Sequence, residues 1–143
     1  MSACAFCSIA AGDGEAHRVY EDDTVVAFLD VRPVTQGHTL VIPKQHAADL
    51  TELSADLGSN MFQVGHTLSR ALRISDLRAD GVNLVVNDGK SAFQTVAHTH
   101  LHVVPRQNGD KLRFVKGLLV RRSSDPEGTA AIIREALERA PES

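Results

Sequence analysis

The apolar positions of this 143-residue chain form five short runs and one long periodic stretch. The short runs are rich in β-branched and apolar residues and are bounded by turn-forming residues, a combination typical of strands. They predict five strands, at residues 17–20, 24–29, 38–42, 82–86 and 98–104. Pro43 and Pro105 end the third and the fifth of these strands, because proline cannot donate a ladder hydrogen bond.

The long periodic stretch lies between the third and fourth predicted strands. Its apolar residues recur every three or four positions, which predicts one apolar stripe on a helix of about five turns. The stripe consists of Leu53, Leu57, Met61, Val64, Leu68 and Leu72. Gly58 and Gly65 interrupt this helix one heptad apart, each at a cost of up to about 1 kcal/mol of helix propensity. They could permit close approach of another helix, or be tolerated because the helix is well packed.

A last helix is expected near the C-terminus. Asp125 suits an N-cap, and Pro126 suits the first turn that follows it. Short strands in sequence, with a helix inserted after the third, predict an α+β domain around an antiparallel sheet. A chain of this length with 43% hydrophobic residues can bury one core, so we expect a single domain over residues 1–143.

The composition excludes some classes of partner. Fifteen basic and eighteen acidic residues give a net charge of −3, whereas a general DNA or RNA binder normally carries a basic face. No apolar run approaches the roughly 20 residues of a membrane span, and the first residues do not resemble a secretory signal. We therefore expect a cytoplasmic protein that acts on neither nucleic acid nor membrane. In that setting the pair Cys4 and Cys7 favours metal or thiol chemistry over a disulfide.

Three alternating histidines in the last predicted strand are the main candidate for chemistry. Residues two apart in a strand face the same side, so His98, His100 and His102 are expected to share one face. A neutral imidazole can attack phosphorus while a neighbouring imidazole assists the leaving group. Imidazole is also a common zinc ligand, so the spacing alone leaves catalysis and metal binding open.

The loop before this strand offers donors for phosphate oxygens. Asn87 and Gln94 bracket it, and the hydroxyl of Thr95 follows directly. Amides and hydroxyls bind phosphate without adding negative charge, and phosphoryl transfer depends largely on positioning and charge stabilisation.

The segment from His98 to Val104 resembles the His-φ-His-φ-His-φ-φ signature of the histidine triad (HIT) superfamily, in which φ is apolar; only Thr99 departs from it. The segments 22–31, 37–44 and 87–94 are similar to further motifs of that family, so the resemblance covers residues 4–110 and leaves 111–143 as an extension. It is nearest to the Hint and bacterial HIT branch. It implies a HIT-like five-stranded antiparallel sheet with a central helix and a C-terminal helix.

The resemblance also implies roles for individual residues. His100 would be the nucleophile that forms a nucleotidyl-histidine intermediate, and the backbone carbonyl of His98 would orient its ring. His102 would contact the phosphate, His38 would complete the cluster, and Asp30 would bind the ribose hydroxyls. The remaining expected nucleotide contacts are Ile9, Phe28, Leu29 and Val31 around the base, and Asn87, Gln94, Thr95 and Val96 near the phosphate.

The same family often carries a structural zinc site. Here it would use Cys4, Cys7, His46 and His98, a Cys₂His₂ set. The Hint branch also forms two-fold dimers, so a homodimer that includes the central helix is expected.

The activity implied by the resemblance is a nucleotide hydrolase. It would act at the α-phosphate of a purine nucleotide, with a phosphoramidate-type leaving group. Two alternatives remain open, a dinucleoside polyphosphate hydrolase and a nucleotide-sensing scaffold with little turnover. The C-terminus lacks the tryptophan of the Hint branch, so the leaving group is the least determined part of the assignment.

Overall fold

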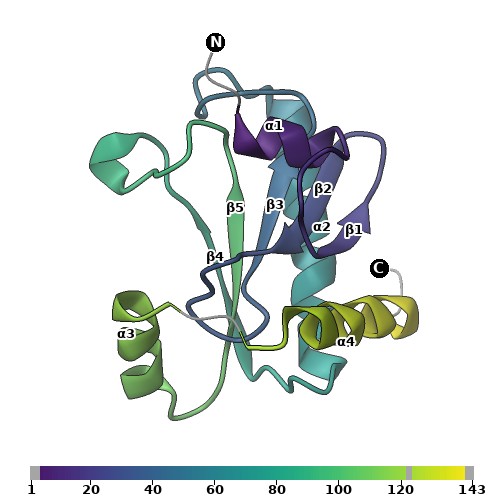
Figure 1. Ribbon diagram of the computed structural model, residues 1–143, viewed down its shortest axis with the longest axis vertical. Helices are drawn as coiled ribbons and strands as arrows, with labels where there is room; N and C mark the ends of the chain where they lie inside the picture. The colour runs from purple at the N-terminus through teal and green to yellow at the C-terminus, as the bar shows by residue number, and fades with distance from the viewer. Residues whose placement is uncertain (1–3, 122–123, 141–143) are drawn as a thin grey trace.

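The computed structural model describes residues 4–121 and 124–140, and its centre is one antiparallel sheet (Figure 1). The strands are β1 (Arg18–Glu21), β2 (Val25–Leu29), β3 (Thr39–Pro43), β4 (Gly81–Val86) and β5 (Leu101–Arg106). Their order across the sheet is β1-β2-β3-β5-β4, and all neighbours pair antiparallel. The predicted α+β class and the five strands are confirmed, with boundaries that differ by a few residues.

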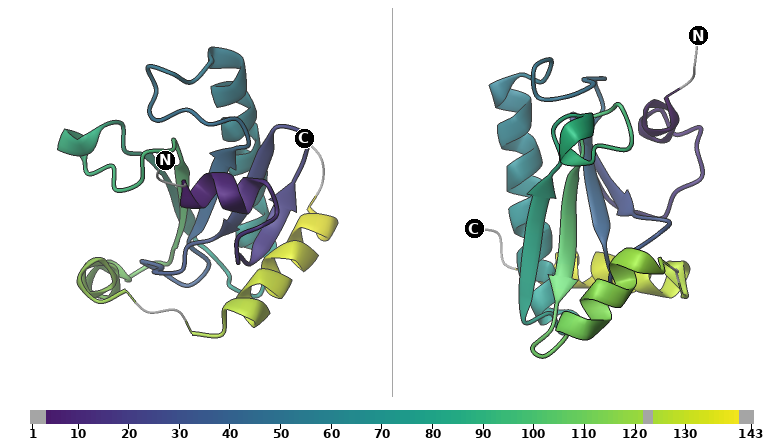
Figure 2. Two further views of the ribbon diagram at one scale, coloured as in Figure 1. Left: turned by 45° about the horizontal axis from the view of Figure 1, so that its top comes forward. Right: turned by 90° about the vertical axis from the view of Figure 1, so that its left-hand side faces the viewer.

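Helices cover both faces of the sheet. The central helix α2 (Ala55–Ile74) packs on one face, against β3, β4 and β5. The short helix α1 (Ala5–Ala10) and the helix α3 (Lys111–Leu119) lie on the opposite side, near opposite ends of the strands (Figure 2). The last helix, α4 (Pro126–Arg139), contacts α2, β1 and β2. A single 3-10 turn, η1 (Lys90–Ala92), interrupts the loop between β4 and β5.

Alternation along the strands divides the core into two clusters. Towards α2, the sheet buries Val25, Ala27, Leu29, Val41, Leu101 and Val103 together with the stripe of that helix. Towards α1, it buries Val26, Phe28, Leu40 and Ile42 against Phe6 and Ile9. Because the α1 face is covered only at its ends, it is the face on which side chains of the sheet can meet a ligand.

The central helix begins and ends close to the predicted positions, and Ser54 caps it by accepting a hydrogen bond from the Leu57 N–H. Its glycines do not share one role. A Cβ on Gly65 would lie 2.7 Å from Cδ2 of Leu101 in the sheet, so this glycine faces the sheet and not a partner helix. A Cβ on Gly58 would meet only Leu53, at an ordinary 3.5 Å. The suggestion that Gly65 serves a helix–helix contact is therefore wrong.

The helices α1 and α3 were not predicted, because each is short and neither has a side-chain N-cap. The C-terminal helix was predicted, and Asp125 caps it by accepting from the Gly128 N–H. Among the helices within residues 4–121 and 124–140, none combines the length and apolar character that a bilayer crossing requires.

Candidate active site

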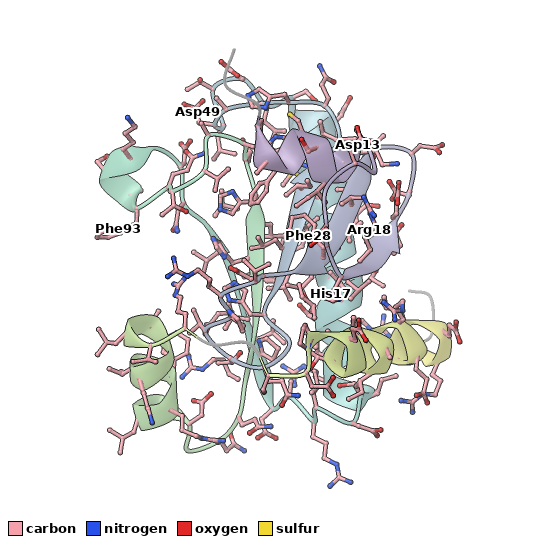
Figure 3. The ribbon with its side chains drawn as sticks, viewed as in Figure 1. Asp13, His17, Arg18, Phe28, Asp49 and Phe93 are labelled. Carbon is pink, nitrogen blue, oxygen red and sulfur yellow. The ribbon has the colours of Figure 1, made fainter. Side chains whose placement is uncertain are left out.

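All three alternating histidines turn their rings towards the α1 side of the sheet, since the His98 ring lies 5.9 Å from the ring of Phe6 and its Nδ1 lies 3.4 Å from Cys4 Sγ. His102 is paired with Leu40 of β3, and Leu40 is paired with Phe28 of β2, so all three side chains point to the same face. Phe28 is labelled in Figure 3. The strand β5 begins only at Leu101, so His98 and His100 precede it. The ring of His100 lies 4.9 Å from that of His102 and 5.2 Å from that of Phe6, measured between centroids.

The backbone carbonyl of His98 fixes the tautomer of His100. The oxygen lies 2.7 Å from His100 Nδ1, and a carbonyl can only accept, so Nδ1 carries the proton. The other ring nitrogen, Nε2, then carries the lone pair. A neutral imidazole with a free Nε2 is the form that a nucleophile requires.

A relay of hydrogen bonds fixes the tautomer of His102. The Val34 N–H donates to His38 Nδ1 at 3.0 Å, so the proton of neutral His38 resides on Nε2. That Nε2 lies 2.9 Å from His102 Nδ1 and donates to it, which places the proton of neutral His102 on Nε2. The pair therefore presents a lone pair on His100 and an N–H donor on His102 side by side.

Both members of the relay are neutral near pH 7. Burial is the main cause that lowers the pKa of His38 to about 4, and electrostatic repulsion by Arg121 and by a protonated neighbouring imidazole adds to it. Burial and the neighbouring histidines His38 and His100 lower the pKa of His102 to about 4, with Asp30 acting in the opposite direction. Neutral imidazoles are therefore the populated forms of His38 and His102 near pH 7, so each carries one ring proton.

Asp30 stands at the edge of this cluster. Its Oδ1 accepts from the Arg32 N–H at 2.8 Å, and its Oδ2 lies 3.6 Å from His38 Nε2. The atoms of Asp30, His38 and His102 are close enough to suggest a metal set. However, both nitrogens of His38 are already used in the relay, so we do not assign a metal there.

The expected base pocket is only partly assembled. Ile9 and Phe28 pack together on the α1 face, with Phe6 as a third wall. Leu29 follows Phe28 in the strand, so it points to the opposite face and joins the core under α2. Val31 is 72% exposed. The structure thus brings Ile9 and Phe28 together but not Leu29 or Val31, and it adds Phe6, which the sequence analysis missed.

The polar side chains of the loop before β5 differ in their exposure and in their hydrogen bonds. The Gln94 amide accepts from the Gly89 N–H at 2.7 Å and donates to the carbonyls of Ala48 and Val96. This amide therefore holds the loop in shape, and its donors are occupied by backbone. Thr95 is exposed, and Asn87 and Val96 are partly buried.

A second cluster lies beside the first and contains the expected metal ligands. One ligand atom each from Cys4, Cys7, His46 and His98 lies within 4.8 Å of the others. The measured separations run from 3.1 Å, between the Nδ1 atoms of His46 and His98, to 3.5 Å, between Cys7 Sγ and His98 Nδ1. Zinc bonds of 2.0–2.3 Å in a tetrahedron require edges of about 3.3–3.8 Å, so the spacing fits zinc after small adjustments.

The tautomer of His98 also suits a metal. Its Nε2 donates to the Pro43 carbonyl at 2.9 Å, which leaves the lone pair on Nδ1, directed at the cluster. A carbonyl that accepts from the outer nitrogen is the usual support for a metal-binding histidine. The same residue thus offers its ring to this cluster and its carbonyl to His100.

The comparisons with known proteins agree with this geometry. The sequence profile of the HIT domain matches residues 11–109. The chain is 50% identical to an uncharacterised HIT-like protein of Mycobacterium tuberculosis over 94% of this chain and 92% of that protein. It is 37% identical to the adenylylsulfatase HINT3 of Arabidopsis thaliana over 76% of this chain and 55% of that protein. A zinc-bound histidine triad family protein from Mycobacterium smegmatis superposes with a TM-score of 0.89 at 51% identity, covering 96% of this chain and 94% of that one.

Proposed function

This chain belongs to the HIT family, and from that premise we propose that it hydrolyses a purine nucleotide at the α-phosphorus through a covalent bond to His100. The observation that carries the proposal is the tautomer pair, a free Nε2 on His100 beside an N–H donor on His102. Both rings lie on the α1 side of the sheet, next to the aromatic walls Phe6 and Phe28.

The proposed reaction has two steps. His100 Nε2 attacks the phosphorus, and the bond from phosphorus to the leaving group breaks with its electron pair going to the leaving group, which departs. Water then attacks the same phosphorus and gives up a proton to solvent, the nitrogen–phosphorus bond breaks with its pair returning to His100 Nε2, and a nucleoside monophosphate is released. His102 stays neutral and donates a hydrogen bond to a phosphate oxygen, which stabilises charge that develops there. Asp30, at the edge of the cluster, would accept hydrogen bonds from the ribose hydroxyls.

We propose further that Cys4, Cys7, His46 and His98 hold one structural zinc ion. The support is the fit of their spacing, the tautomer of His98, and the zinc-bound relative from Mycobacterium smegmatis. Zinc would supply a fixed crosslink between the start of α1 and the segment that leads into β5, and no catalytic step would pass through it.

The covalent intermediate provides the test. Wild-type protein is mixed briefly with a purine nucleoside phosphoramidate and quenched. It should gain the mass of one nucleoside monophosphate, and peptide mapping should place that mass on His100. His100→Ala should lose the adduct and several orders of magnitude in rate, at least about 6 kcal/mol of barrier lowering. It should still bind a nucleoside monophosphate.

The other readings predict different results. A nucleotide-sensing scaffold would bind the nucleotide without forming an adduct, which would refute the enzymatic proposal. A dinucleoside polyphosphate hydrolase would form the adduct but would use the polyphosphate far better than any other substrate. A His100→Ala variant with near-wild-type turnover would show that another residue is the nucleophile.

A further inference from the structure

The helix α3 turns its apolar side away from the protein. Leu112, Val115 and Leu119 are exposed on it, Leu112 by 87% and Leu119 by 80%. Residues three and four positions apart are neighbours on a helix surface, so these three side chains form one continuous strip, which we call the outer stripe. A helix at the surface of a globular protein normally turns such a strip towards the core. The outer stripe is therefore an apolar surface that the fold leaves uncovered.

The opposite side of α3 holds the helix on the protein. A Cβ on Gly117 would collide with the Val34 carbonyl oxygen, so the helix backbone lies directly against the loop between β2 and β3. The Arg106 guanidinium lies 3.8 Å from the ring centroid of Phe114, and it also forms two hydrogen bonds with Asp110 at the start of the helix. These contacts fix the rotation of α3 about its axis, so the outward direction of the outer stripe is set by the fold.

Cations border the outer stripe. Residues 111–121 include four basic side chains and no acidic one, although the whole chain has a net charge of −3. At about 100° per residue, Lys111 and Lys116 fall on either side of the outer stripe around the helix, and both are exposed. Neither lysine forms an ion pair within the described residues. The surface of α3 thus combines exposed apolar side chains with positive charge that is available to a partner.

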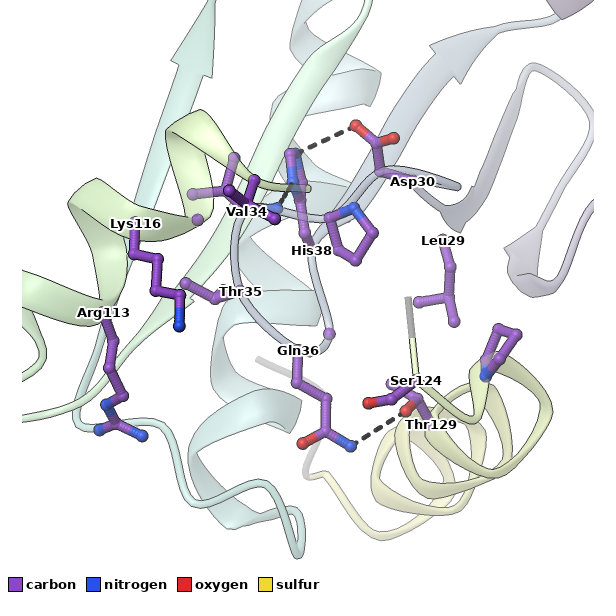
Figure 4. Close-up of a pocket in the computed structure, with 15 residues that line it drawn as sticks. Leu29, Asp30, Val34, Thr35, Gln36, His38, Arg113, Lys116, Ser124 and Thr129 are labelled. Atoms are coloured by element: carbon purple, nitrogen blue, oxygen red, sulfur yellow. Dashed lines mark hydrogen bonds and ion pairs between the residues drawn. The ribbon is translucent and has the colours of Figure 1, made fainter. Parts of the chain in front are cut away.

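The inner border of this surface faces the candidate active site. Figure 4 shows Arg113 and Lys116 reaching from α3 to one side of a pocket of about 570 Å³ that Asp30 and His38 also line. Val34, against which Gly117 packs, is the residue whose N–H donates to His38. The helix α3 therefore lies between the outer surface and the histidine cluster.

We propose that α3 docks on the surface of an anionic lipid bilayer, with the outer stripe among the headgroups and Lys111 and Lys116 against lipid phosphates. Apolar side chains bordered by lysines on one helix are the combination that binds the interface of an anionic membrane. Such a contact needs no membrane-spanning segment, so it agrees with the lengths of the described helices. The proposal goes beyond the proposed function, and it replaces the expectation from composition that the protein contacts no membrane.

A protein partner fits this surface less well. A stable protein–protein interface takes about 20–30 residues from each side, whereas the outer stripe offers three, with the half-exposed Leu118 and Val120 next to it. A second copy that docked α3 against α3 would bring the lysines of both helices together, and like charges oppose such a contact. A bilayer requires no complementary shape, and its anionic headgroups match the charge of α3.

Vesicle flotation tests the proposal. Wild-type protein is mixed with vesicles of phosphatidylcholine alone, or of phosphatidylcholine and phosphatidylglycerol in equal parts, at low and at high salt. We expect it to float with the anionic vesicles at low salt, and to stay behind at high salt and with phosphatidylcholine alone. Lys111→Gln should weaken the association about fivefold, the contribution of one lysine near an anionic surface. Leu112→Ser/Leu119→Ser should lose most of it, because the inserted apolar area is removed.

Matched variants place the contact on the protein. Phe93→Ser removes a side chain that is 82% exposed but lies outside α3, and Lys90→Gln removes an exposed lysine outside α3. Both should float as the wild type does. The chain contains no tryptophan, so Val115→Trp reports on α3 alone. Its emission should shift to the blue when anionic vesicles are added, because the indole leaves water.

Wild-type protein that stayed off the anionic vesicles at low salt would overturn the inference, and so would equal flotation with phosphatidylcholine alone. Flotation that survived Leu112→Ser/Leu119→Ser, or that left the emission of Val115→Trp unchanged, would place the contact outside α3 and overturn it too. Absence of flotation, together with a smaller mass of the double variant in light scattering, would overturn it in favour of a second copy of the chain. No outcome depends on His100, so the proposed function is tested separately.

Discussion

Two backbone groups decide where the protons of the histidine cluster reside. The His98 carbonyl places the proton of His100 on Nδ1, and the Val34 N–H, acting through His38, places the proton of His102 on Nε2. Without such hydrogen bonds, a neutral imidazole can carry its proton on either ring nitrogen. His38 is therefore a positioning residue. Because it is buried and neutral, it can accept from Val34 and donate to His102 at the same time.

Acid should destabilise the protein because of this burial. The pKa of His38 is about 4 in the folded state and near 6.5 in an unfolded chain, so the unfolded state binds more protons in between. Stability attributable to His38 is complete above pH 6.5 and is lost as the pH falls towards 4, by about 3 kcal/mol. Urea unfolding at pH 7.0, about pH 5.5 and about pH 4.5 measures this loss.

The histidine responsible can be identified with two variants. His38→Asn should be less stable than wild type at pH 7, and its stability should fall less between pH 7 and about 4.5. His66→Gln alters an exposed histidine on α2 and should follow the wild-type curve. If His38→Asn lost stability with acid as steeply as wild type, the burial of His38 would not be the cause.

At the scale of elements, α1 depends on the cluster at its start. Six residues without a side-chain N-cap are too few to form a stable helix alone. What holds α1 is the packing of Phe6 and Ile9 on the sheet and the approach of Cys4 and Cys7 to His46 and His98. A metal crosslink would therefore also fix Phe6 against His100.

Purified wild-type protein without a metal-binding tag is expected to contain about one zinc per chain. The Cys4→Ser/Cys7→Ser variant should contain none and should melt at a lower temperature, because metal binding contributes directly to folding free energy. Elemental analysis and thermal unfolding provide the two readouts. Equal zinc in both proteins would place the metal elsewhere or show it to be adventitious.

The close contact between α3 and the backbone of Val34 requires a residue without a side chain at position 117. Gly117→Ala should destabilise the protein by about 1–3 kcal/mol, because the new methyl group meets a backbone oxygen that cannot move aside. It should also weaken nucleotide binding by shifting the segment that holds His38. Thermal unfolding and calorimetric titration measure the two effects.

Gly58→Ala is the matched control for that change. Its new methyl group would lie 3.5 Å from a leucine side chain on α2, an ordinary contact. Alanine is the better helix former, so Gly58→Ala should be neutral or stabilise by up to about 1 kcal/mol. A Gly117→Ala protein as stable as Gly58→Ala would contradict the close packing of α3 on Val34.

For the whole molecule, the two edges of the sheet differ. The edge strand β1 is contacted by α4, whereas the edge strand β4 carries Val85 and Val86 at 41% and 39% exposure. An open edge with apolar side chains favours pairing with another chain. We therefore predict a homodimer that joins two sheets through β4 and includes the outer surface of α2.

Light scattering on the eluting protein at micromolar concentration should give twice the chain mass of 15.4 kDa. Val86→Lys should shift the protein towards the monomer, because a charge on the edge opposes pairing. Lys90→Gln, an exposed change beyond the end of β4, should leave the mass unchanged. A wild-type mass near 15.4 kDa would exclude the dimer.

The sequence by itself determined what depends on local periodicity and on short motifs. Short β-branched apolar runs predicted the strands, the stripe from Leu53 to Leu72 predicted α2, and the pair Asp125 and Pro126 predicted the start of α4. The spacing of Cys4 and Cys7, and of the three histidines, named part of the two clusters, and the family resemblance implied the rest, including His38 and His46. These signals are readable because each depends on neighbours only a few positions away.

Only the tertiary structure decided which atoms of those residues face each other. His98 turns its ring to the cysteines because it precedes β5 and bonds to Pro43, 55 positions away. Leu29 leaves the base pocket because the register of β2 sends it to the other face. The short helices α1 and α3 exist through long-range packing, so the aromatic wall at Phe6 had no local signal strong enough to predict it.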